Sequence, residues 1–459
     1  MTFAIRGIIE GFYGRPWSHG ARLDMIDFIA ELGMNVYAYS PKDDPFLRSR
    51  WRDPLDDRSR RATQELITAC GERDIDLWYC VSPGLTVEYG SDSEVDALVS
   101  RFSEIAEHGV RSFGVFLDDI PTRLQHTEDR GAYGDLVEAQ LDFLARTHRA
   151  LGARVPGARL IVCPTRYWGR GDEPGISRFG SGLPAGVELL WTGRQICSAT
   201  IDRDDARRVE LASGRRPIFW DNYPVNDVAM AGELHIGPFR GRSADLDSAA
   251  TGLIANVMEL AEASKIALAT IADYLRDPAG YDPDRSWAAA IERLIPEPAD
   301  RAAFVDFAEN SLSSCLAEDD ALRLTAALDR LAFLTHLGRP EEGAAGLLEL
   351  ASRYRTAAGR LRSPHFSAPH LAGEIRPWVD AFALGADVIE RIGLAHLDGS
   401  ADEPARRAEW LAHRDRLRAT GLRVFGDVLD MTLTDLSRIH TTTTFEGERP
   451  CHQDRSHVH

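Results

Sequence analysis

Eight short runs of apolar, β-branched and aromatic residues recur through the first 275 or so residues of this chain, with helical patterns between them. The runs do not alternate strictly between apolar and polar positions, which is typical of parallel strands buried on both faces. Several of the helical patterns end at a glycine or a cationic residue, as helices commonly do. The runs are centred near Ile8, Tyr37, Tyr79, Phe116, Val162, Leu190, Phe219 and Ile254. Eight strand and helix repeats in this length predict an α/β fold, a (β/α)8 TIM barrel.

The character of the chain changes after about Tyr281, where strand-like runs stop and Ala, Leu, Arg and Glu dominate. Long apolar stripes at helical spacing predict an all-α helical bundle there. We therefore expect a barrel at 1–280 and a bundle at 281–440, joined by the Pro- and Asp-rich stretch 277–287. The final residues, 441–459, lack apolar periodicity and are expected to be a disordered tail.

The charge balance limits the partners that such a chain can bind. The formal net charge is −18 and the pI is about 5.3. Nucleic acids and anionic membrane surfaces both require a basic footprint, so neither is an expected partner. A neutral or basic ligand fits the charge better.

Six cysteines are scattered along the sequence without CxxC or CxxH spacing, so they indicate neither a zinc site nor a disulfide framework. The start of the chain lacks a long apolar segment behind a basic region, and no later stretch approaches the length of a membrane span. These features favour a protein with reduced thiols that stays in the cytoplasm and crosses no membrane.

Polar and aromatic residues crowd the carboxyl ends of the predicted strands, where a TIM barrel carries its working residues. Carboxylates, amides and aromatic rings together are the mixture that stacks on a sugar ring and binds its hydroxyls. The simpler alternative is that polar loops begin wherever strands end. The residues at these ends include Glu10, Tyr13, Trp17, Lys42, Asp43, Asp44, Asp118, Asp119, Tyr167, Trp191, Thr192, Trp220, Asp221, Asn222, Asn226, Asp227 and Asn256.

The adjacent carboxylates Asp118 and Asp119 follow the apolar run GVFL and are the strongest catalytic candidates. Two neighbouring anions repel, so one is expected to hold a proton and act as a general acid while the other stays ionised. Retaining glycosidases with their own nucleophile place two carboxyls about 5 to 5.5 Å apart on either side of the bond. Sequence neighbours suit the substrate-assisted alternative better, in which a 2-acetamido group is the nucleophile.

Two other interpretations of these carboxylates remain open at this stage. A double aspartate also occurs at helix caps, and together with Lys42, Asp43 and Asp44 it could hold a divalent cation. No HxH, DxD or two-histidine pattern supports a metal site. We therefore expect no metal.

Roughly residues 5 to 275 resemble the catalytic domain of glycoside hydrolase family 84, the O-GlcNAcases and hyaluronidase-like β-N-acetylglucosaminidases. Ten ordered matches are much more specific than any one motif. They are EGFYGRPW from Glu10, YAYSPKDDP from Tyr37, WRDP from Trp51, SPGL from Ser82, FLDDI from Phe116, CPTRY from Cys163, WTG from Trp191, WDNYPVND from Trp220, GPFRGR from Gly237 and GLIAN from Gly252.

This resemblance implies a retaining exo-β-N-acetylglucosaminidase that releases terminal GlcNAc from O-GlcNAc-modified protein or glycan fragments. Asp118 would orient the substrate acetamide, and Asp119 would protonate the leaving oxygen and later activate water. An oxazoline intermediate connects the two steps. No metal or organic cofactor is implied.

The resemblance also assigns sugar-binding roles. Tyr167 and Asn222 would hydrogen-bond the acetamide or the intermediate, while Cys163 and Trp220 would wall the acetyl pocket. Such a pocket would select 2-acetamido sugars.

Four further residues would bind the sugar hydroxyls by the same resemblance. Asp227 would hold O4 and O6, and the Gly11 carbonyl, Lys42 and Asn256 would hold O3 and O4. That arrangement would favour exo cleavage.

Structural alternatives exist for some of these positions. Gly11 could simply permit a tight turn, Lys42 could pair with Asp43 or Asp44, and Trp191 could be core. At the level of function, the alternatives are an endo-acting hyaluronidase-like enzyme and a non-catalytic GlcNAc-binding barrel. The helical bundle carries no ligand motif and is a candidate surface for homodimerisation.

Overall fold

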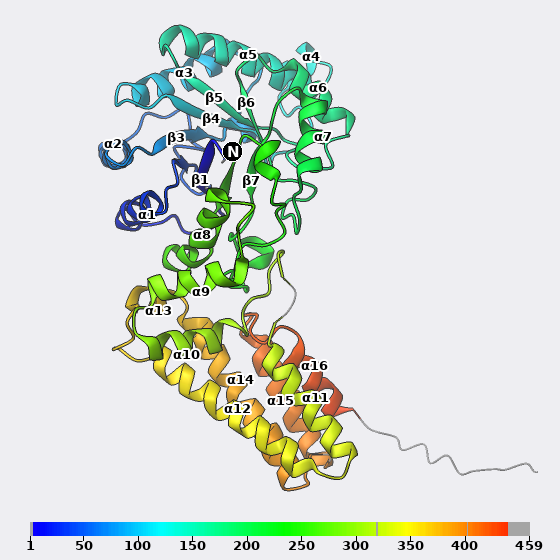
Figure 1. The fold of residues 1–459 in the computed structure, drawn as a ribbon. Helices are drawn as coiled ribbons and strands as arrows, with labels where there is room; N and C mark the ends of the chain where they lie inside the picture. Colours follow the sequence, from blue (N-terminus) through cyan, green and yellow to red (C-terminus); the bar gives the residue numbers. More distant parts are fainter. Residues whose placement is uncertain (1–2, 318–319, 402, 439–459) are drawn as a thin grey trace, which may run out of the picture.

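The computed structural model describes residues 3–317, 320–401 and 403–438, and its amino-terminal part is a closed parallel barrel (Figure 1). Each strand pairs with the next in sequence, and β8 returns to pair with β1, which confirms the predicted TIM barrel. The strands are β1 (Ile5–Glu10), β2 (Val36–Tyr39), β3 (Asp76–Val81), β4 (Ser112–Phe116), β5 (Arg159–Cys163), β6 (Glu188–Trp191), β7 (Ile218–Asp221) and β8 (Gly252–Asn256).

Helices surround the barrel and pack their apolar faces onto its outer side (Figure 1). Side-chain carboxylates cap several of them at the N-terminus, as in α7, where Asp202 and Asp205 form a capping box. The helices are α1 (His19–Glu31), α2 (Asp57–Gly71), α3 (Asp92–Ala106), α4 (Thr127–Ala132), α5 (Leu136–Arg154), α6 (Pro174–Gly182), α7 (Arg203–Ser213) and α8 (Ala261–Arg276).

A separate apolar cluster fills the inside of the barrel, which is therefore a packed core and not a pore. Large rings such as Trp78 and Phe116 share this space with small residues. A Cβ on Gly114 would lie 2.5 Å from the Cys80 sulfur, so this strand position has room only for glycine. The upper end of the cluster is formed by Cys163 and Trp220, at the carboxyl ends of their strands.

The rest of the described chain is helical and has its own core, in which Phe307, Tyr354, Phe382 and Phe425 pack together. This agrees with the predicted helical region. Its elements are α9 (Pro283–Leu294), α10 (Pro298–Ala308), α11 (Leu322–His336), α12 (Pro340–Leu361), α13 (Pro369–Glu374), α14 (Arg376–Leu397), α15 (Pro404–Ala419) and α16 (Val428–Ser437).

The stretch predicted as a linker is only partly irregular. Its second half already belongs to α9, because Pro283 suits the first helical turn and Asp282 caps the helix by accepting a hydrogen bond from Arg285 N. The predicted tail at 441–459 lies outside the described residues. Across the described ranges, every helix is too short or too polar to span a bilayer.

Two tryptophans attach the helical part to the loop that follows β7. The Trp287 indole donates to the Ile236 carbonyl over 2.7 Å, and the Trp378 indole donates to the Gly232 carbonyl over 2.9 Å. The helical part therefore supports the long segment between β7 and β8, which also carries residues at the carboxyl end of the barrel.

Glu10 ends β1 but points into a structural ion pair. Its side chain is fully buried and accepts two hydrogen bonds from Arg22 of α1, at 2.8 and 2.7 Å, and a third from the Tyr37 hydroxyl at 2.8 Å. A buried charge with every acceptor satisfied joins the first strand to the first helix.

Replacing Glu10 with alanine is expected to lower the free energy of unfolding by about 3 kcal/mol, because the nearly buried Arg22 guanidinium loses the carboxylate that it pairs with. Urea denaturation measures this change. The matched control is Glu65→Ala, which removes the exposed partner of His19 and should leave the midpoint almost unchanged. Equal losses in the two variants would contradict the structural role of Glu10.

Candidate active site

A cavity of about 460 Å³ opens at the carboxyl ends of the barrel strands, and all ten residues proposed from the sequence line it. The strands bring these residues together because the carboxyl ends of parallel strands meet at one end of a barrel. The ten are Gly11, Lys42, Asp118, Asp119, Cys163, Tyr167, Trp220, Asn222, Asp227 and Asn256.

Asp118 lies just beyond β4, is almost completely buried and forms an ion pair with the Lys42 ammonium through Oδ2. Burial is the largest single influence on the pKa of Lys42 and lowers it. The Asp118 charge, together with Tyr13, Asp119 and the hydrogen bond to Asp118, raises this pKa by more, so the net shift is upward and Lys42 stays protonated. Within the described part of the chain, the buried Oδ1 of Asp118 has no hydrogen-bond partner. One carboxylate oxygen is thus neutralised, and the other can accept a bond from a ligand.

The alternative partners of Lys42 are occupied elsewhere. Asp43 accepts a hydrogen bond from the Gly14 amide at 3.1 Å, while Asp44 accepts from the Tyr39 hydroxyl at 3.2 Å and from Phe46 N at 2.8 Å. Lys42 therefore lines the cavity, while Asp43 and Asp44 stabilise the loop that follows β2.

Asp119 differs from Asp118 in both backbone and surroundings. Its φ is +53°, a left-handed conformation that non-glycine residues rarely adopt. An extended strand would send neighbouring side chains to opposite faces, whereas this turn lets both carboxylates line one cavity. Asp119 is exposed and accepts hydrogen bonds from the Tyr13 hydroxyl at 2.9 Å and the Tyr167 hydroxyl at 2.8 Å.

The two tyrosines that hold Asp119 remain neutral donors. Burial is the main cause that raises the pKa of both Tyr13 and Tyr167, and the Asp119 charge raises each further. Two hydroxyls aimed at one carboxylate fix its position at the mouth of the cavity.

A chain of amides lines the side of the cavity formed by β1, β7 and β8. Gly11 N donates to Asn256 Oδ1 at 3.2 Å, Asn256 Nδ2 donates to Asn222 Oδ1 at 2.9 Å, and Asn222 Nδ2 donates to the Ile196 carbonyl at 2.8 Å. This order fixes which end of each amide faces which neighbour. A Cβ on Gly11 would lie 2.7 Å from the Trp220 ring, so the backbone approaches the ring as closely as only glycine allows.

The floor of the cavity is apolar. Trp220 and Cys163 are almost fully buried, and the Trp220 ring packs against Phe116 with centroids 5.4 Å apart. Burial raises the pKa of the Cys163 thiol well above its ordinary value, so it remains protonated. The Lys42 ammonium lies 5.3 Å from the centre of the Trp220 ring, which places one cation between the apolar floor and Asp118.

Several residues that line the cavity were not assigned from the sequence. The signal for Tyr13 was its place in EGFYGRPW. No sequence pattern marked the other lining residues, which lie in the loops after β6 and after β7. Trp191, in contrast, belongs to the core and does not line the cavity. The unassigned lining residues are Tyr13, Thr192, Ile196, Cys197, Val225 and Val228 to Met230.

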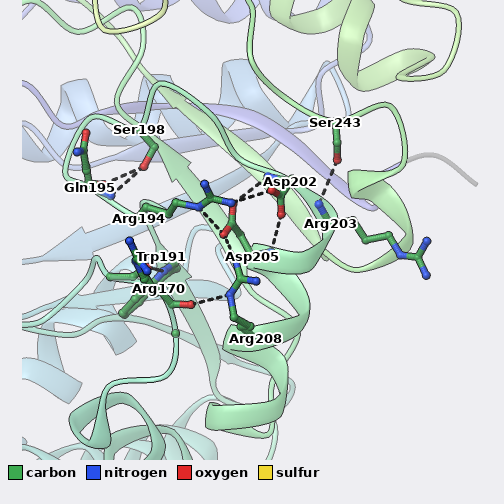
Figure 2. A network of polar contacts seen from close by, with 12 residues as sticks. Arg170, Trp191, Arg194, Gln195, Ser198, Asp202, Arg203, Asp205, Arg208 and Ser243 are labelled. Atoms are coloured by element: carbon green, nitrogen blue, oxygen red, sulfur yellow. Dashed lines mark hydrogen bonds and ion pairs between the residues drawn. The ribbon is translucent and has the colours of Figure 1, made fainter. Parts of the chain in front are cut away.

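The loop between β6 and α7, which carries Thr192, Ile196 and Cys197, is held by its own hydrogen bonds (Figure 2). Gln195 N donates to the Ser198 hydroxyl at 3.1 Å, which closes a tight turn. Arg194 donates to Asp202 at 2.8 Å and to Asp205 at 2.7 Å, which ties this turn to the start of α7. The rim of the cavity is therefore fixed independently of any ligand.

The described residues contain no group of three or more His, Cys, Asp or Glu side chains placed to hold a metal ion. Within this cavity the charge next to the acidic pair comes from Lys42.

The chain has close counterparts among known proteins. The family model of the beta-N-acetylglucosaminidases matches residues 6–309. The protein O-GlcNAcases of Rattus norvegicus and Mus musculus are each 30% identical over 276 residues, which is 59% of this chain. The chain spans 30% of the length of these two relatives.

Solved structures match over nearly the whole chain. A mutant of the O-GlcNAc hydrolase of Thermobaculum terrenum is 34% identical, with a TM-score of 0.88 and 95% of both chains covered. The structure named CpGH84B is 26% identical, with a TM-score of 0.82 over 95% of this chain and 77% of its own. With its barrel and most of its length matched, the chain belongs to the beta-N-acetylglucosaminidase family, glycoside hydrolase family 84.

Proposed function

We propose that this chain hydrolyses terminal β-linked N-acetylglucosamine with retention of configuration, using the acetamide of the substrate as the nucleophile. The observation that carries this proposal is the contrast between two adjacent aspartates. Asp118 is buried, paired with Lys42 and has one unpartnered oxygen, whereas Asp119 is exposed and held by two tyrosine hydroxyls. Such an environment suits Asp118 for orienting a ligand and Asp119 for transferring a proton.

In the first step, Asp118 Oδ1 accepts the N–H of the acetamide and turns its carbonyl oxygen toward the anomeric carbon. The negative charge of Asp118 stabilises the positive charge that develops on the acetamide nitrogen as the ring closes. Asp119 donates a proton to the glycosidic oxygen as that bond breaks. Trp220 and Cys163 enclose the acetyl methyl group, and the result is an oxazoline.

In the second step, Asp119 is a carboxylate and removes a proton from water. That water opens the oxazoline at the anomeric carbon, so the product keeps the β configuration. Tyr13 and Tyr167 keep this carboxylate in place, because their neutral hydroxyls donate hydrogen bonds to its two oxygens. Asn222 donates a hydrogen bond to the intermediate.

The substrate is proposed to enter with its non-reducing end toward Asp227, Lys42 and Asn256, which bind the O3, O4 and O6 hydroxyls. Because these hydroxyls would be bound by the protein, a further sugar could not be attached to them. This favours exo cleavage over a hyaluronidase-like endo cleavage. The non-catalytic alternative is disfavoured, because both aspartates and every hydroxyl-binding residue are present.

The similarity to proteins named O-GlcNAcase and O-GlcNAc hydrolase suggests O-GlcNAc-modified protein as one substrate class. Terminal GlcNAc on glycan fragments is the other class, since the roles proposed for the cavity residues concern the sugar and not the group to which it is attached. Homodimerisation through the helical part stays a prediction.

The test is hydrolysis of 4-nitrophenyl β-N-acetylglucosaminide, followed by proton NMR of the first product. The β anomer should appear first, before mutarotation. The matching β-glucoside lacks the acetamide and should react at least about a thousandfold more slowly, since it has no nucleophile. Initial release of the α anomer, or comparable rates for the two glycosides, would exclude substrate assistance.

A pH dependence of KM follows from Asp227. Burial raises the pKa of this half-buried carboxyl above its ordinary value of 3.8, although the Tyr13 amide, 2.7 Å away, opposes the shift. Only the carboxylate accepts hydrogen bonds from two sugar hydroxyls, so KM should rise as the pH falls through the raised pKa. In Asp227→Asn, KM should be high and nearly independent of pH.

The matched control for this measurement is Asp43→Asn, which alters an exposed carboxylate beside the cavity that does not line it. Its KM profile should follow that of the unaltered chain. An unchanged KM profile in Asp227→Asn would remove Asp227 from the binding site.

A further inference from the structure

Two arginines flank Asp119 at the mouth of the cavity. The Tyr13 hydroxyl donates to Asp119 Oδ2 and the Tyr167 hydroxyl donates to Asp119 Oδ1, so the two rings reach the carboxylate at different oxygens. The guanidinium carbon of Arg48 lies 5.0 Å from the centre of the Tyr13 ring. Arg166 directly precedes Tyr167 in the chain. Each arginine is therefore next to one of the two tyrosines that hold Asp119.

Neither of these arginines forms an ion pair with a carboxylate of the described residues. Arg48 contacts the Tyr13 ring, and Arg166 lies over the Trp168 ring and donates to the Trp168 carbonyl at 3.1 Å. Arg50, on the same loop as Arg48, does pair with a carboxylate. Acidic residues outnumber basic ones in this chain by 71 to 53, so possible partners are plentiful. Two guanidinium groups thus stay available at the mouth for an external anion.

Arg166 also lines a second cavity, of about 250 Å³, beside the first. Thr122, three positions after Asp119, lines it as well, and so does Asp135, which is already paired with Arg178. The helices α5 and α6 that form its wall lie at the end of the molecule away from the helical part (Figure 1). This wall offers packing for the methylene groups of a long side chain, and Arg166 offers a partner for a carboxylate at its end. The apolar wall residues are Leu136, Val137, Ile176 and Phe179.

The loop that follows Asp119 adds a third cation. Arg123 is exposed, and its side chain has no hydrogen bond or ion pair within the part of the chain that the structure describes. It lines a groove that shares Thr122, Asp135 and Leu136 with the cavity beside Arg166. The Tyr167 side of the mouth therefore carries two guanidinium groups without a carboxylate partner, although the net charge of the chain is −18.

The position of these cations on both sides of Asp119 distinguishes between two kinds of aglycone. The departing oxygen has to contact Asp119 to receive its proton, so the aglycone lies at the mouth between Tyr13 and Tyr167. An unbranched glycan continues from that oxygen in one direction. A serine or threonine within a peptide has chain on both sides of the oxygen. Cations on both sides therefore match a peptide better than a glycan.

We infer, on the basis of the glycosidase activity proposed above, that the preferred aglycone is a peptide with Asp or Glu on both sides of the modified serine or threonine. Arg48 binds an acidic side chain on one side, and Arg166, together with Arg123, binds one on the other side. An extended peptide advances about 3.4 Å per residue, so acidic residues within about three positions of the modified one are in reach. The opposite charges also speed the encounter of an acidic peptide with the mouth.

The test compares O-GlcNAc peptides of one length that carry Glu, Gln or Lys on both sides of the modified serine. We expect kcat/KM at low salt to fall about tenfold from the Glu peptide to the Gln peptide, since each exposed ion pair contributes modestly, and to fall further for the Lys peptide. Sodium chloride at about 0.5 M should remove most of the difference, because salt screens exposed charges. Equal values for the three peptides at low salt would overturn the inference.

Charge reversal tests the assignment of the two sides. Peptides with Glu on only one side of the serine are compared with the Gln peptide in Arg48→Glu and in Arg166→Glu, as ratios of kcat/KM, so that a general loss of activity cancels. Each variant should lose the preference for a different side. Loss of the same side in both variants, or of neither side, would contradict the two-sided arrangement.

The matched control is Arg149→Glu, which reverses the charge of an exposed arginine near the end of α5. Helices of a βα barrel run back from the carboxyl ends of the strands to their amino ends, so Arg149 lies away from the cavity mouth. This variant should keep both preferences and the rate with 4-nitrophenyl β-N-acetylglucosaminide. Loss of the acidic preference in Arg149→Glu would mean that the total charge of the chain, and not the arginines at the mouth, selects the peptide.

Failure of the acidic preference is distinguishable from failure of the proposed glycosidase. Absence of hydrolysis of 4-nitrophenyl β-N-acetylglucosaminide would contradict the glycosidase. Hydrolysis-resistant peptides with S-linked GlcNAc would still rank the Glu, Gln and Lys flanks by their Kd, and equal Kd values would overturn the inference without any turnover. A disaccharide of GlcNAc and glucuronic acid that reacts faster than the Glu peptide would also overturn it, in favour of an acidic glycan.

Discussion

Replacing Asp119 with asparagine is expected to reduce kcat/KM by about 10³-fold for N-acetylglucosaminides with poor leaving groups, such as a serine side chain. An amide cannot donate a proton of comparable acidity to the departing oxygen. The loss should be much smaller, about tenfold or less, for 2,4-dinitrophenolate, which leaves without protonation. The second step also needs a base, so the oxazoline should accumulate with the activated substrate and give a burst followed by slow turnover.

The dependence on leaving group is the diagnostic measurement for Asp119. A series of aryl glycosides should give a steeper plot of log kcat/KM against leaving-group pKa in Asp119→Asn than in the unaltered chain. Asp43→Asn serves as the matched control, because it alters a nearby exposed carboxylate outside the cavity. Equal losses for all leaving groups would mean that Asp119 does not transfer the proton.

The barrel could be predicted from the sequence because its strands are short, continuously apolar and evenly spaced. The run around Val162, for example, becomes β5, in which Leu160 to Cys163 are all buried. Period and burial are local properties, so the residues themselves report them. The predicted linker at 277–287 is only partly irregular, because Asp282 and Pro283 look like linker residues and also start a helix.

The cavity residues on strand ends could also be predicted, because barrel topology alone brings the ends of β1, β2, β4, β5, β7 and β8 together. The direction in which each side chain points could not be predicted in the same way. Glu10 and Asp119 both follow apolar runs, yet Glu10 turns to Arg22 and Asp119 faces the cavity. The left-handed backbone at Asp119 turns its side chain into the cavity, and no local sequence pattern predicts that conformation.

The rim of the cavity was beyond prediction for a different reason. Ile196 and Cys197 occupy a turn whose shape depends on contacts with the more distant Asp202 and Asp205. Such long-range contacts leave no periodic signal, so only the folded structure brings these residues together.

Asp118→Asn is expected to lower kcat/KM by about 10³-fold for every leaving group, because Asp118 acts on the nucleophile and not on the departing oxygen. The amide loses the charge that stabilises the developing positive charge on the acetamide nitrogen. Binding of a thiazoline analogue of the intermediate should weaken in parallel. A loss that varied with the leaving group would contradict this role.

A second variant separates the chemistry from the stability of the site. Asp118→Asn leaves the buried Lys42 ammonium without its counter-charge, which should destabilise the chain by about 3 kcal/mol. Adding Lys42→Met removes the unpaired charge and should restore most of the unfolding free energy, because a methionine of similar length packs beside Trp220. Activity should stay at the level of Asp118→Asn or below it. If activity returned together with stability, the loss in the single variant would be a folding defect, and Asp118 would have no separate role in orienting the acetamide.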